Sequence, residues 1–402
     1  MKKAVMYGAG NIGRGFIVQL FCESGYETAL IDVNMTVINK LNEDGKYPVY
    51  VTKGETYEEH IVDHVRGVDG KDVAAIAREI ADADIMATAV GVNILKFIAP
   101  NVAEGVKLRC KEKIEAPLNI IICENMIGAD AYFTGLVKGY LDEAEKAYFD
   151  SHIALVEPSI GRMVPATPKE IAEKNPLAVC VEEYCELPVD KAAFKGEIPQ
   201  IAHMVPFTPF DFYIQRKLFM HNMSHAITAY FGKRKGYTYI WEASEDAEIK
   251  YLSLRALLES SRALSAEHGV DLGSLIDFSG NLLHRYENKL LGDTIDRVGR
   301  DTKRKLSEND RFVGAAKLCL KHGILPVNIC AGIAAALFFA PEGDPTSAEV
   351  HAYAEEHGPE AALVQYCGIE KDSPLQGLVR NVYDRLKAGE ALMSVICAIN
   401  DR

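Results

Sequence analysis

Apolar residues follow two different rhythms along the two halves of the chain. In the first half, short apolar runs at residues 3–7, 27–31, 85–90 and 118–123 alternate with segments of helical periodicity. Such alternation predicts a parallel, doubly wound sheet with helices on both faces. In the second half, long amphipathic segments predict a mainly α-helical domain, at residues 210–231, 247–267, 272–286, 310–322 and 327–339. We therefore expect an α/β protein with two domains, in residues 1–195 and 196–402.

A glycine-rich turn follows the first apolar run, with the sequence Gly8-Ala9-Gly10-Asn11-Ile12-Gly13. It lies between a predicted strand and a predicted helix, the setting in which GxGxxG binds a dinucleotide in a Rossmann-type domain. Gly8 allows the tight turn, Gly10 lets a pyrophosphate approach the backbone, and Gly13 lets the helix pack on the strand. Asp32 ends the next strand and is placed to bind the ribose 2′-OH. Because no arginine follows Asp32, the pattern favours NAD over NADP.

Two further strand ends are predicted to face the cofactor. The run 85–90 ends in small residues and Val90, and the run 118–123 leads into Asn125. The carboxyl ends of the strands line the ligand crevice of a doubly wound sheet, so we assign Val90 and Asn125 to the cofactor site. A turn or helix N-cap role for Asn125 is an equal alternative. Two later strands, at residues 177–184 and 187–189, are expected to close the sheet.

The candidate catalytic groups lie in the first long helical segment of the second half. On a regular α-helix Lys217, His225 and Asn222 lie at about 0°, 80° and 140° around the axis, on one broad face. A lysine, an imidazole and an amide that converge in this way offer a proton acceptor, an orienting group and a donor to a carbonyl oxygen. The alternative is an ordinary amphipathic helix with a solvated lysine.

A basic segment near residue 300 is unusual in this acidic chain. Clustered cations at a glycine turn could hold a small anionic group, and the candidate substrate-binding residues are Arg297, Arg300, Arg304 and Lys305, with Arg311 just beyond. The alternative is a solvated loop whose cations pair with neighbouring aspartates, at positions 293, 296, 301 and 310.

Composition excludes several classes of protein. The formal net charge of −13 argues against a nucleic-acid-binding surface. Nine cysteines form no CxxC pair, which fits reduced thiols in a cytoplasmic protein. We expect no leader and no membrane span, because no apolar run approaches the roughly 18 residues that a span needs. His60 and His64 have the spacing of a helical metal pair, but alternation around them predicts a strand, and no metal is expected.

Taken in order, these motifs resemble the polyol-specific long-chain dehydrogenases. The resemblance rests on the glycine-rich turn continued by Arg14-Gly15, on Asp32-Val33-Asn34, on Cys123-Glu124-Asn125-Met126, and on the K-x4-N-x2-H pattern of Lys217, Asn222 and His225. Later matches extend it over nearly the whole chain, at Leu187–Lys191, Arg285–Asn288 and Asp296–Arg300. The context Val298-Gly299-Arg300 is similar to that of the sugar-phosphate branch of the family.

The resemblance implies metal-independent hydride transfer with NAD between mannitol 1-phosphate and fructose 6-phosphate. It assigns Lys217 as the general base, Asn222 as the donor to the developing alkoxide, and His225 as the residue that positions the substrate oxygen. It also implies a monomer that acts on a small sugar phosphate or polyol. The lysine replaces the Lewis acid of zinc alcohol dehydrogenases, and its amine must be neutral to act as a base.

Two departures from the family pattern fall in regions expected near the substrate. Gly161 stands where the family carries an aspartate, and Thr302 stands where it carries a proline. A related polyol or hexuronate dehydrogenase is therefore the alternative within the family. Two other classes are a metal enzyme that uses His221 and His225, and an NAD sensor without catalysis. The missing third ligand argues against the first, and the intact catalytic triplet argues against the second.

Overall fold

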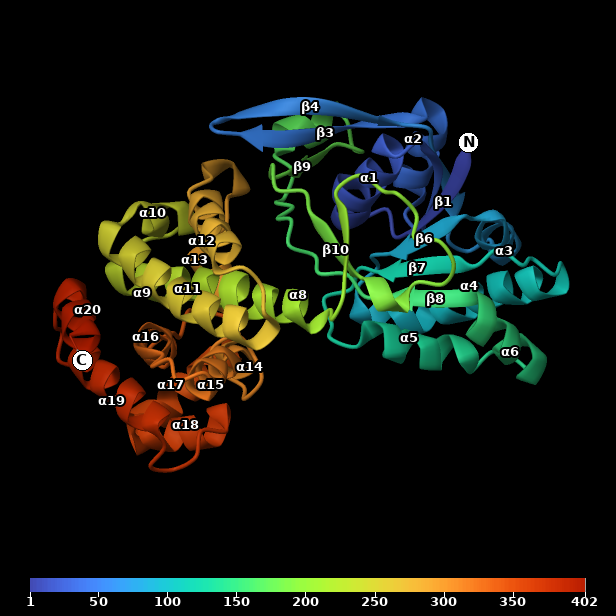
Figure 1. The fold of residues 1–402 in the computed structure, drawn as a ribbon. Coiled ribbons are helices and arrows are strands. Elements are labelled where there is room, and N and C mark those ends of the chain that lie inside the picture. Colours follow the sequence, from blue (N-terminus) through green and yellow to red (C-terminus); the bar gives the residue numbers. More distant parts are fainter. Residues whose placement is uncertain (402) are drawn as a thin grey trace. The chain divides into compact units, whose positions relative to one another are not determined.

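The computed structural model describes residues 1–401, which form two compact units. The first unit ends at Tyr213 and the second begins at Ile214 (Figure 1). Sequence patterning places the domain boundary after residue 195. The first unit extends further because β11 (Met204–Phe207) pairs in parallel with β10 (Leu187–Asp190).

The first unit contains the predicted doubly wound parallel sheet. Its six strands lie in the order β5-β2-β1-β6-β7-β8, and every neighbouring pair is parallel. The interior strands β6 and β7 are buried along their whole length, as is typical of a sheet covered on two faces. The strands are β1 (Lys2–Tyr7), β2 (Tyr26–Asp32), β5 (Val65–Asp69), β6 (Ile85–Thr88), β7 (Leu118–Ile122) and β8 (Ile153–Val156).

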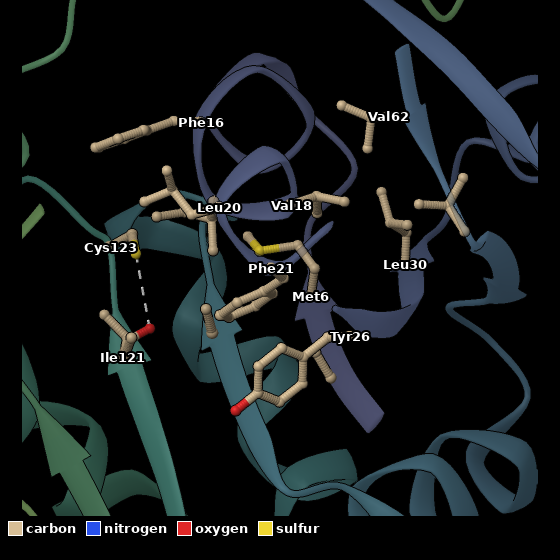
Figure 2. Packing of buried hydrophobic residues seen from close by; sticks show 14 of the residues in the cluster. Met6, Phe16, Val18, Leu20, Phe21, Tyr26, Leu30, Val62, Ile121 and Cys123 are labelled. Atoms are coloured by element: carbon tan, nitrogen blue, oxygen red, sulfur yellow. Dashed lines mark hydrogen bonds between the residues drawn. The ribbon is translucent and has the colours of Figure 1, made fainter. Parts of the chain in front are cut away.

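Two hydrophobic clusters cover the two faces of this sheet. Successive residues of β1 point to opposite faces, so Met6 joins one cluster and Val5 joins the other. In the first cluster Met6 packs with Phe16, Leu20 and other residues of the helix that follows the glycine-rich turn (Figure 2). The second cluster packs against α3 (Val73–Asp82), α4 (Leu95–Lys111), α5 (Ala129–Lys138) and α6 (Glu143–His152).

The prediction that the strands near residue 180 close the main sheet was wrong. Instead, β9 (Val179–Val181) pairs in parallel with β3 (Lys46–Lys53), which pairs antiparallel with β4 (Thr56–Asp63). The chain turns back over the first helix because buried Arg162 donates to the Glu182 carbonyl at 3.0 Å and to Gln19 Oε1 at 2.8 Å. His60 lies in β4, which confirms the strand reading of that segment. Within residues 1–401 no cluster of three or more His, Cys, Asp or Glu is arranged to hold a metal ion.

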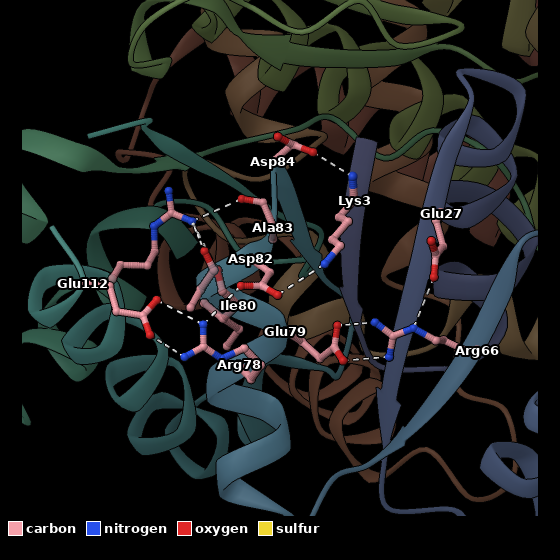
Figure 3. A network of polar contacts seen from close by, with 12 residues as sticks. Lys3, Glu27, Arg66, Arg78, Glu79, Ile80, Asp82, Ala83, Asp84 and Glu112 are labelled. Carbon is pink, nitrogen blue, oxygen red and sulfur yellow. Dashed lines mark hydrogen bonds and ion pairs between the residues drawn. The ribbon is translucent and has the colours of Figure 1, made fainter. Parts of the chain in front are cut away.

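Charged side chains gather where the parallel strands begin, opposite the edge predicted to bind the cofactor (Figure 3). Lys3, near the start of β1, binds Asp84 through its backbone N–H at 2.7 Å and Asp82 through Nζ at 3.2 Å. Arg78 pairs with Glu112, and Arg66 pairs with Glu79 and Glu27. Such exposed pairs contribute about 0–1 kcal/mol each, so this network orients the surface more than it stabilises the core.

The second unit is helical, as predicted. Its centre is formed by α9 (Met223–Lys235) and α16 (Val327–Ala336), and all residues of α16 are buried. The two helices approach closely because Gly332 has no side chain, since a Cβ there would lie 2.7 Å from Ile227. The surrounding helices are α10 (Ile240–Glu245), α11 (Ala247–His268), α12 (Leu272–Tyr286), α13 (Ile295–Gly299), α14 (Thr302–Lys305), α15 (Val313–Lys321), α17 (Pro345–His357), α18 (Pro359–Cys367), α19 (Pro374–Lys387) and α20 (Leu392–Asn400). No helix in residues 1–401 has both the length and the hydropathy required of a membrane span.

Two glycines of the same turn give a matched test of the packing. We expect Gly13→Ala to lower the free energy of unfolding by about 1–3 kcal/mol, because its Cβ would lie 2.1 Å from the Gly8 carbonyl oxygen. The control is Gly10→Ala, whose Cβ meets no described atom within 4 Å and should change stability by less than about 0.5 kcal/mol. Urea unfolding measures both, and equal stabilities of the two variants would contradict this account.

Candidate active site

The glycine-rich turn joins β1 to a helix that contains a π-helical segment near its start. Gly8 has φ +106°, and a Cβ there would lie 2.6 Å from the Ala89 carbonyl oxygen, so two strand ends meet at this glycine. Of the remaining predicted residues, Ala9 is buried, Ile12 is partly buried, and Gly10 and Asn11 are exposed. The turn therefore leaves an open backbone surface at Gly10, next to the start of a helix, which suits a pyrophosphate.

Asp32 lies at the carboxyl end of β2 and is tied to this turn. Its Oδ2 accepts a hydrogen bond from the Ala9 N–H at 2.8 Å, and its Oδ1 accepts one from the Asn34 N–H at 2.9 Å. Each carboxylate oxygen has a second lone pair, so Asp32 keeps acceptor capacity for a ribose hydroxyl. The carboxylate is thus oriented by the protein before any ligand binds.

Hydrogen bonds to Glu124, which follows β7, hold the end of β6 against the end of β7, although this residue was assigned no role from the sequence. Buried Glu124 accepts hydrogen bonds from Thr88 Oγ1 at 2.7 Å and from the Val90 N–H at 2.9 Å, and burial raises its pKa. Val90 is consequently held at the sheet edge. Asn125 lies in an exposed bend, which agrees with a turn role, and it is not a helix N-cap, because the N-cap of α5 is Gly128. The signal for Glu124 was its place at the end of a buried strand.

The sequence predicts a regular α-helix around the candidate catalytic residues, but the structure contains a π-helical segment there. After α8 (Asp211–Arg216), the π-helical segment η4 (Lys217–Asn222) leads into α9, and the Met223 N–H bonds the carbonyl five residues earlier, at Leu218. With i→i+5 bonding, one turn takes between about four and five residues and not about 3.6, so Lys217 and Asn222 lie closer to the same side of the axis. The wide turn therefore brings these two groups closer in angle than regular α-helix geometry predicts.

A second π-helical segment, η1 (Gly13–Ile17), begins the helix after the glycine-rich turn. In both segments a buried tyrosine binds a carbonyl of the wide turn. Tyr47 Oη donates to the Arg14 carbonyl at 2.8 Å, and Tyr286 Oη donates to the His221 carbonyl at 2.9 Å. Arg162 also donates to the Gly15 carbonyl, at 3.2 Å. Because π-helical turns are rare and concentrate at functional sites, their coincidence with the two predicted sites supports both.

Lys217 has the properties that a lysine base requires. Burial of its amine, and then the positive charge of Arg311, lower its pKa to about 8. An ammonium loses hydration when it is buried, so the neutral amine becomes accessible near neutral pH. Asn222 follows on the same wide turn and is partly exposed.

His225 is held as a neutral ring. Burial first, and then the charges of Arg297 and Arg285, lower the pKa of His225 to about 3. Its ring stacks on Tyr286, with the centroids 4.7 Å apart and the planes within 7°. Asp293 Oδ2 lies 3.6 Å from Nε2, beyond hydrogen-bonding distance, and within the described residues Nε2 has no hydrogen-bond partner. The ring is therefore oriented by stacking.

His221 is close to His225 but belongs to the core. The two ring centroids are 5.9 Å apart, and burial holds the pKa of His221 well below its usual value. Ser224 Oγ lies 2.9 Å from Tyr286 Oη, which continues the buried polar chain from α9 to α12. The rings of His221 and His225 both lie beside the ring of Tyr286, with centroids 6.0 Å and 4.7 Å from it.

The structure divides the basic segment into exposed and buried residues. Arg300 is exposed, and the side chains of Arg297 and Arg304 are 60% and 54% exposed. Arg297 pairs with Asp293, and Arg304 pairs with Asp301 at 2.8 Å, as the solvated-loop alternative describes. Lys305 is buried, donates to the Arg300 carbonyl, and has a pKa lowered to about 7, mainly by burial. Arg311 is also buried, and its charge acts on Lys217 and His225.

The segment around Gly161 has a structural role in the first unit. Arg162 is buried, and its donors bind the Glu182 carbonyl, the Gly15 carbonyl and Gln19. At Gly161 a Cβ would lie 3.2 Å from the Tyr184 ring, so the glycine allows close packing there. These contacts explain why this departure from the expected pattern is compatible with the fold.

Comparisons with known proteins agree with this division of the chain. A family model described as the mannitol dehydrogenase Rossmann domain matches residues 2–203, and one described as the mannitol dehydrogenase C-terminal domain matches residues 210–396. A D-sorbitol dehydrogenase in substrate-free form is similar in structure, with a TM-score of 0.83, 14% identity, and 98% of this chain and 94% of that chain covered. A Pseudomonas fluorescens mannitol 2-dehydrogenase in ternary complex with NAD and D-mannitol has a TM-score of 0.72 at 14% identity, and covers 100% of this chain and 94% of that chain. At these identities the structural matches show a shared fold.

The position of Asp32 leads to a cofactor prediction. We expect Asp32→Asn to shift the ratio of the NADPH and NADH dissociation constants at least about tenfold toward NADPH, because a charged acceptor for the 2′-OH is lost and repulsion of a 2′-phosphate is removed. The amide oxygen can still accept from the Ala9 N–H, so the turn should stay in place. Fluorescence titration measures both constants. The control is Asp69→Asn, which changes the carboxylate paired with Asp32 in register on β5, and an equal shift there would contradict the assignment.

Proposed function

Because the chain belongs to the mannitol dehydrogenase family, we propose that it is a mannitol-1-phosphate 5-dehydrogenase, which interconverts mannitol 1-phosphate and fructose 6-phosphate with NAD. The observation that carries the proposal is Lys217, whose buried amine has a lowered pKa and which lies on the same wide helical turn as Asn222, eight residues before His225. The cofactor is NAD, in keeping with the Rossmann domain and with Asp32 at the end of β2.

Lys217 is the proposed proton acceptor in oxidation and the proposed proton donor in reduction. When bound, NAD accepts a hydride from the carbinol carbon in oxidation and returns it in reduction. In oxidation the neutral Lys217 amine takes the hydroxyl proton while the C–O bond becomes a carbonyl. In reduction the ammonium form returns that proton to the oxygen. A pKa of about 8 allows both directions near neutral pH, since neither form is then rare.

Asn222 and His225 act on the same oxygen in this proposal. The Asn222 amide donates a hydrogen bond where negative charge develops, and a fixed dipole of this kind stabilises the transition state more than the ground state. The neutral His225 ring, held by Tyr286, positions the oxygen between Lys217 and Asn222. The neutral ring suits this role because, with a pKa of about 3, it stays unprotonated at the pH at which the Lys217 amine takes the proton.

The phosphate preference rests on the basic segment. In a chain of net charge −13, a dianion needs a local group of cations. We propose that Arg297, Arg300, Arg304 and Lys305 provide this group, with exposed Arg300 as the first candidate for contact. A related polyol or hexuronate dehydrogenase is the alternative, and it would leave these residues as a solvated, aspartate-paired surface. We further propose that the enzyme acts as a cytoplasmic monomer.

The substrate prediction is tested by NADH oxidation. We expect kcat/KM for fructose 6-phosphate to exceed the values for fructose and fructuronate by at least about 100-fold, the loss expected when a phosphate-binding cation pair goes unused. Lys217→Ala should abolish turnover while NADH still binds. Arg300→Gln should raise KM for the phosphate selectively, and Lys303→Gln, an exposed lysine paired with Glu349 at 2.8 Å, is the matched control. Equal turnover of fructose or fructuronate would overturn the substrate assignment and keep the chemistry.

The pKa of Lys217 sets a pH prediction. For oxidation of mannitol 1-phosphate, kcat/KM should rise with pH and level off above an apparent pKa of about 8, because the amine must be neutral. For reduction of fructose 6-phosphate, kcat/KM should fall above the same pH, because the ammonium is then the reactive form. His225, with a pKa of about 3, should add no step between pH 5 and 9. Profiles that lack this opposite dependence would contradict Lys217 as the proton-transfer group.

A further inference from the structure

Arg311 is a buried charge that the mechanism above does not use. Its side chain is only 10% exposed, and its Nε donates to Asp310 Oδ1 at 2.8 Å. Asp310 also lies 3.7 Å from Arg304, so one carboxylate serves two cations. Because burying a guanidinium is unfavourable, its position calls for a physical reason.

Packing places Arg311 beside the catalytic turn. A Cβ on Gly314 would lie 2.7 Å from the Phe219 ring, so α15 and η4 are in direct contact at this glycine. Lys217 is two residues from Phe219, and Arg311 is three residues from Gly314. Phe312 stacks on Tyr230 of α9, with the centroids 5.9 Å apart. The segment that carries Arg311 therefore packs against both η4 and α9.

The charge of Arg311 reaches the whole candidate site. Burial is the largest cause of the lowered pKa of Lys217, His221, His225 and Lys305, and the charge of Arg311 acts in the same direction on all four. On α11, the buried Glu259 carboxylate instead accepts hydrogen bonds from Asn328 and Ile329 at the start of α16. The charged or titratable groups that η4 and its neighbours bring to this region are His221 and His225 on the helix itself, Arg285 and Tyr286 on α12, Glu259 on α11, and Arg311 with Asp310 before α15.

We propose that Arg311 is a positioning residue for proton transfer, whose fixed positive charge favours the neutral, proton-accepting form of the neighbouring Lys217 amine. The inference rests on the proposed role of Lys217 as the base. A cation near a desolvated lysine favours the neutral amine, which is an established way to activate a lysine. Arginine suits this task because it stays protonated throughout the working pH range, so its effect does not vary with pH.

The test compares variants that change the charge in opposite directions. Arg311→Gln removes the charge and should move the Lys217 limb of both kcat/KM profiles up by roughly one pH unit. Arg311→Lys keeps the charge and should leave the limb in place. Asp310→Asn weakens the compensating carboxylate and should move the limb down. The matched control is Lys317→Gln, which removes one cation from the surface of α15 and should not move the limb.

A direct titration separates this inference from the proposed function. Protein labelled with ¹³C at the lysine ε-carbon gives an NMR signal for Lys217, assigned by its absence in Lys217→Arg. The signal should titrate at a higher pH in Arg311→Gln than in wild type, and at a lower pH in Asp310→Asn. This readout needs no substrate, so it holds even where fructose 6-phosphate is not turned over and the proposed function fails. Where Arg311→Gln does not fold, as judged by circular dichroism, Asp310→Asn carries the test.

Three results would overturn the role of Arg311. Reduced stability of Arg311→Gln with an unchanged Lys217 titration would make Arg311 a structural residue. A raised KM for fructose 6-phosphate with an unchanged pH profile would make it a substrate ligand. An unchanged limb in Asp310→Asn, in a folded protein, would show that the local charge does not control the amine.

Discussion

The proposed chemistry of the second unit depends on the burial of one lysine amine, that of Lys217. Solvated lysine stays protonated far above neutral pH, so Lys217 serves as a base only where burial disfavours its charge. The helices that contact η4, which are α9, α11 and α15, supply that burial. The polar groups that accompany the lysine are in turn held by one another, as the chain Ser224, Tyr286 and His221 shows. A site of this kind needs a rigid helical unit around it.

The predicted site in the first unit depends on a different requirement, because the backbone of the glycine-rich turn must lie close to the cofactor. Gly8 and Gly13 lie where side chains would collide with carbonyl oxygens, and Gly10 leaves its surface open. Each unit solves its problem with a π-helical turn whose carbonyl is bound by a buried tyrosine, Tyr47 in one and Tyr286 in the other. A wide turn changes which residues share a side of the helix, and a buried donor compensates for the disturbed backbone hydrogen bonding. The same local device thus shapes both predicted sites.

The parts that sequence patterning predicted are those set by local rules. Alternating apolar runs predicted the doubly wound sheet, long amphipathic segments predicted the helical second unit, and the glycine spacing located the turn. What it missed depends on long-range contacts. β9 leaves the main sheet because Arg162 and Gly15 draw it onto the first helix, where a Cβ on Gly15 would lie 2.8 Å from Val179. Likewise, no local pattern distinguishes buried Lys305 and Arg311 from exposed Arg300, since all belong to one basic segment. The π-helical segment η4 carries no glycine or proline that would mark it in the sequence.

Chemical rescue is the measurement that tests the central claim most directly. Lys217→Ala removes the amine and leaves space where it stood, so small primary amines added to the assay can enter and take its place as the base. The account predicts that such amines restore NADH formation from mannitol 1-phosphate, with a rate that increases with the basicity of the amine. Absence of rescue by every amine, in a variant that folds and binds NADH as wild type does, would contradict Lys217 as the group that moves the proton.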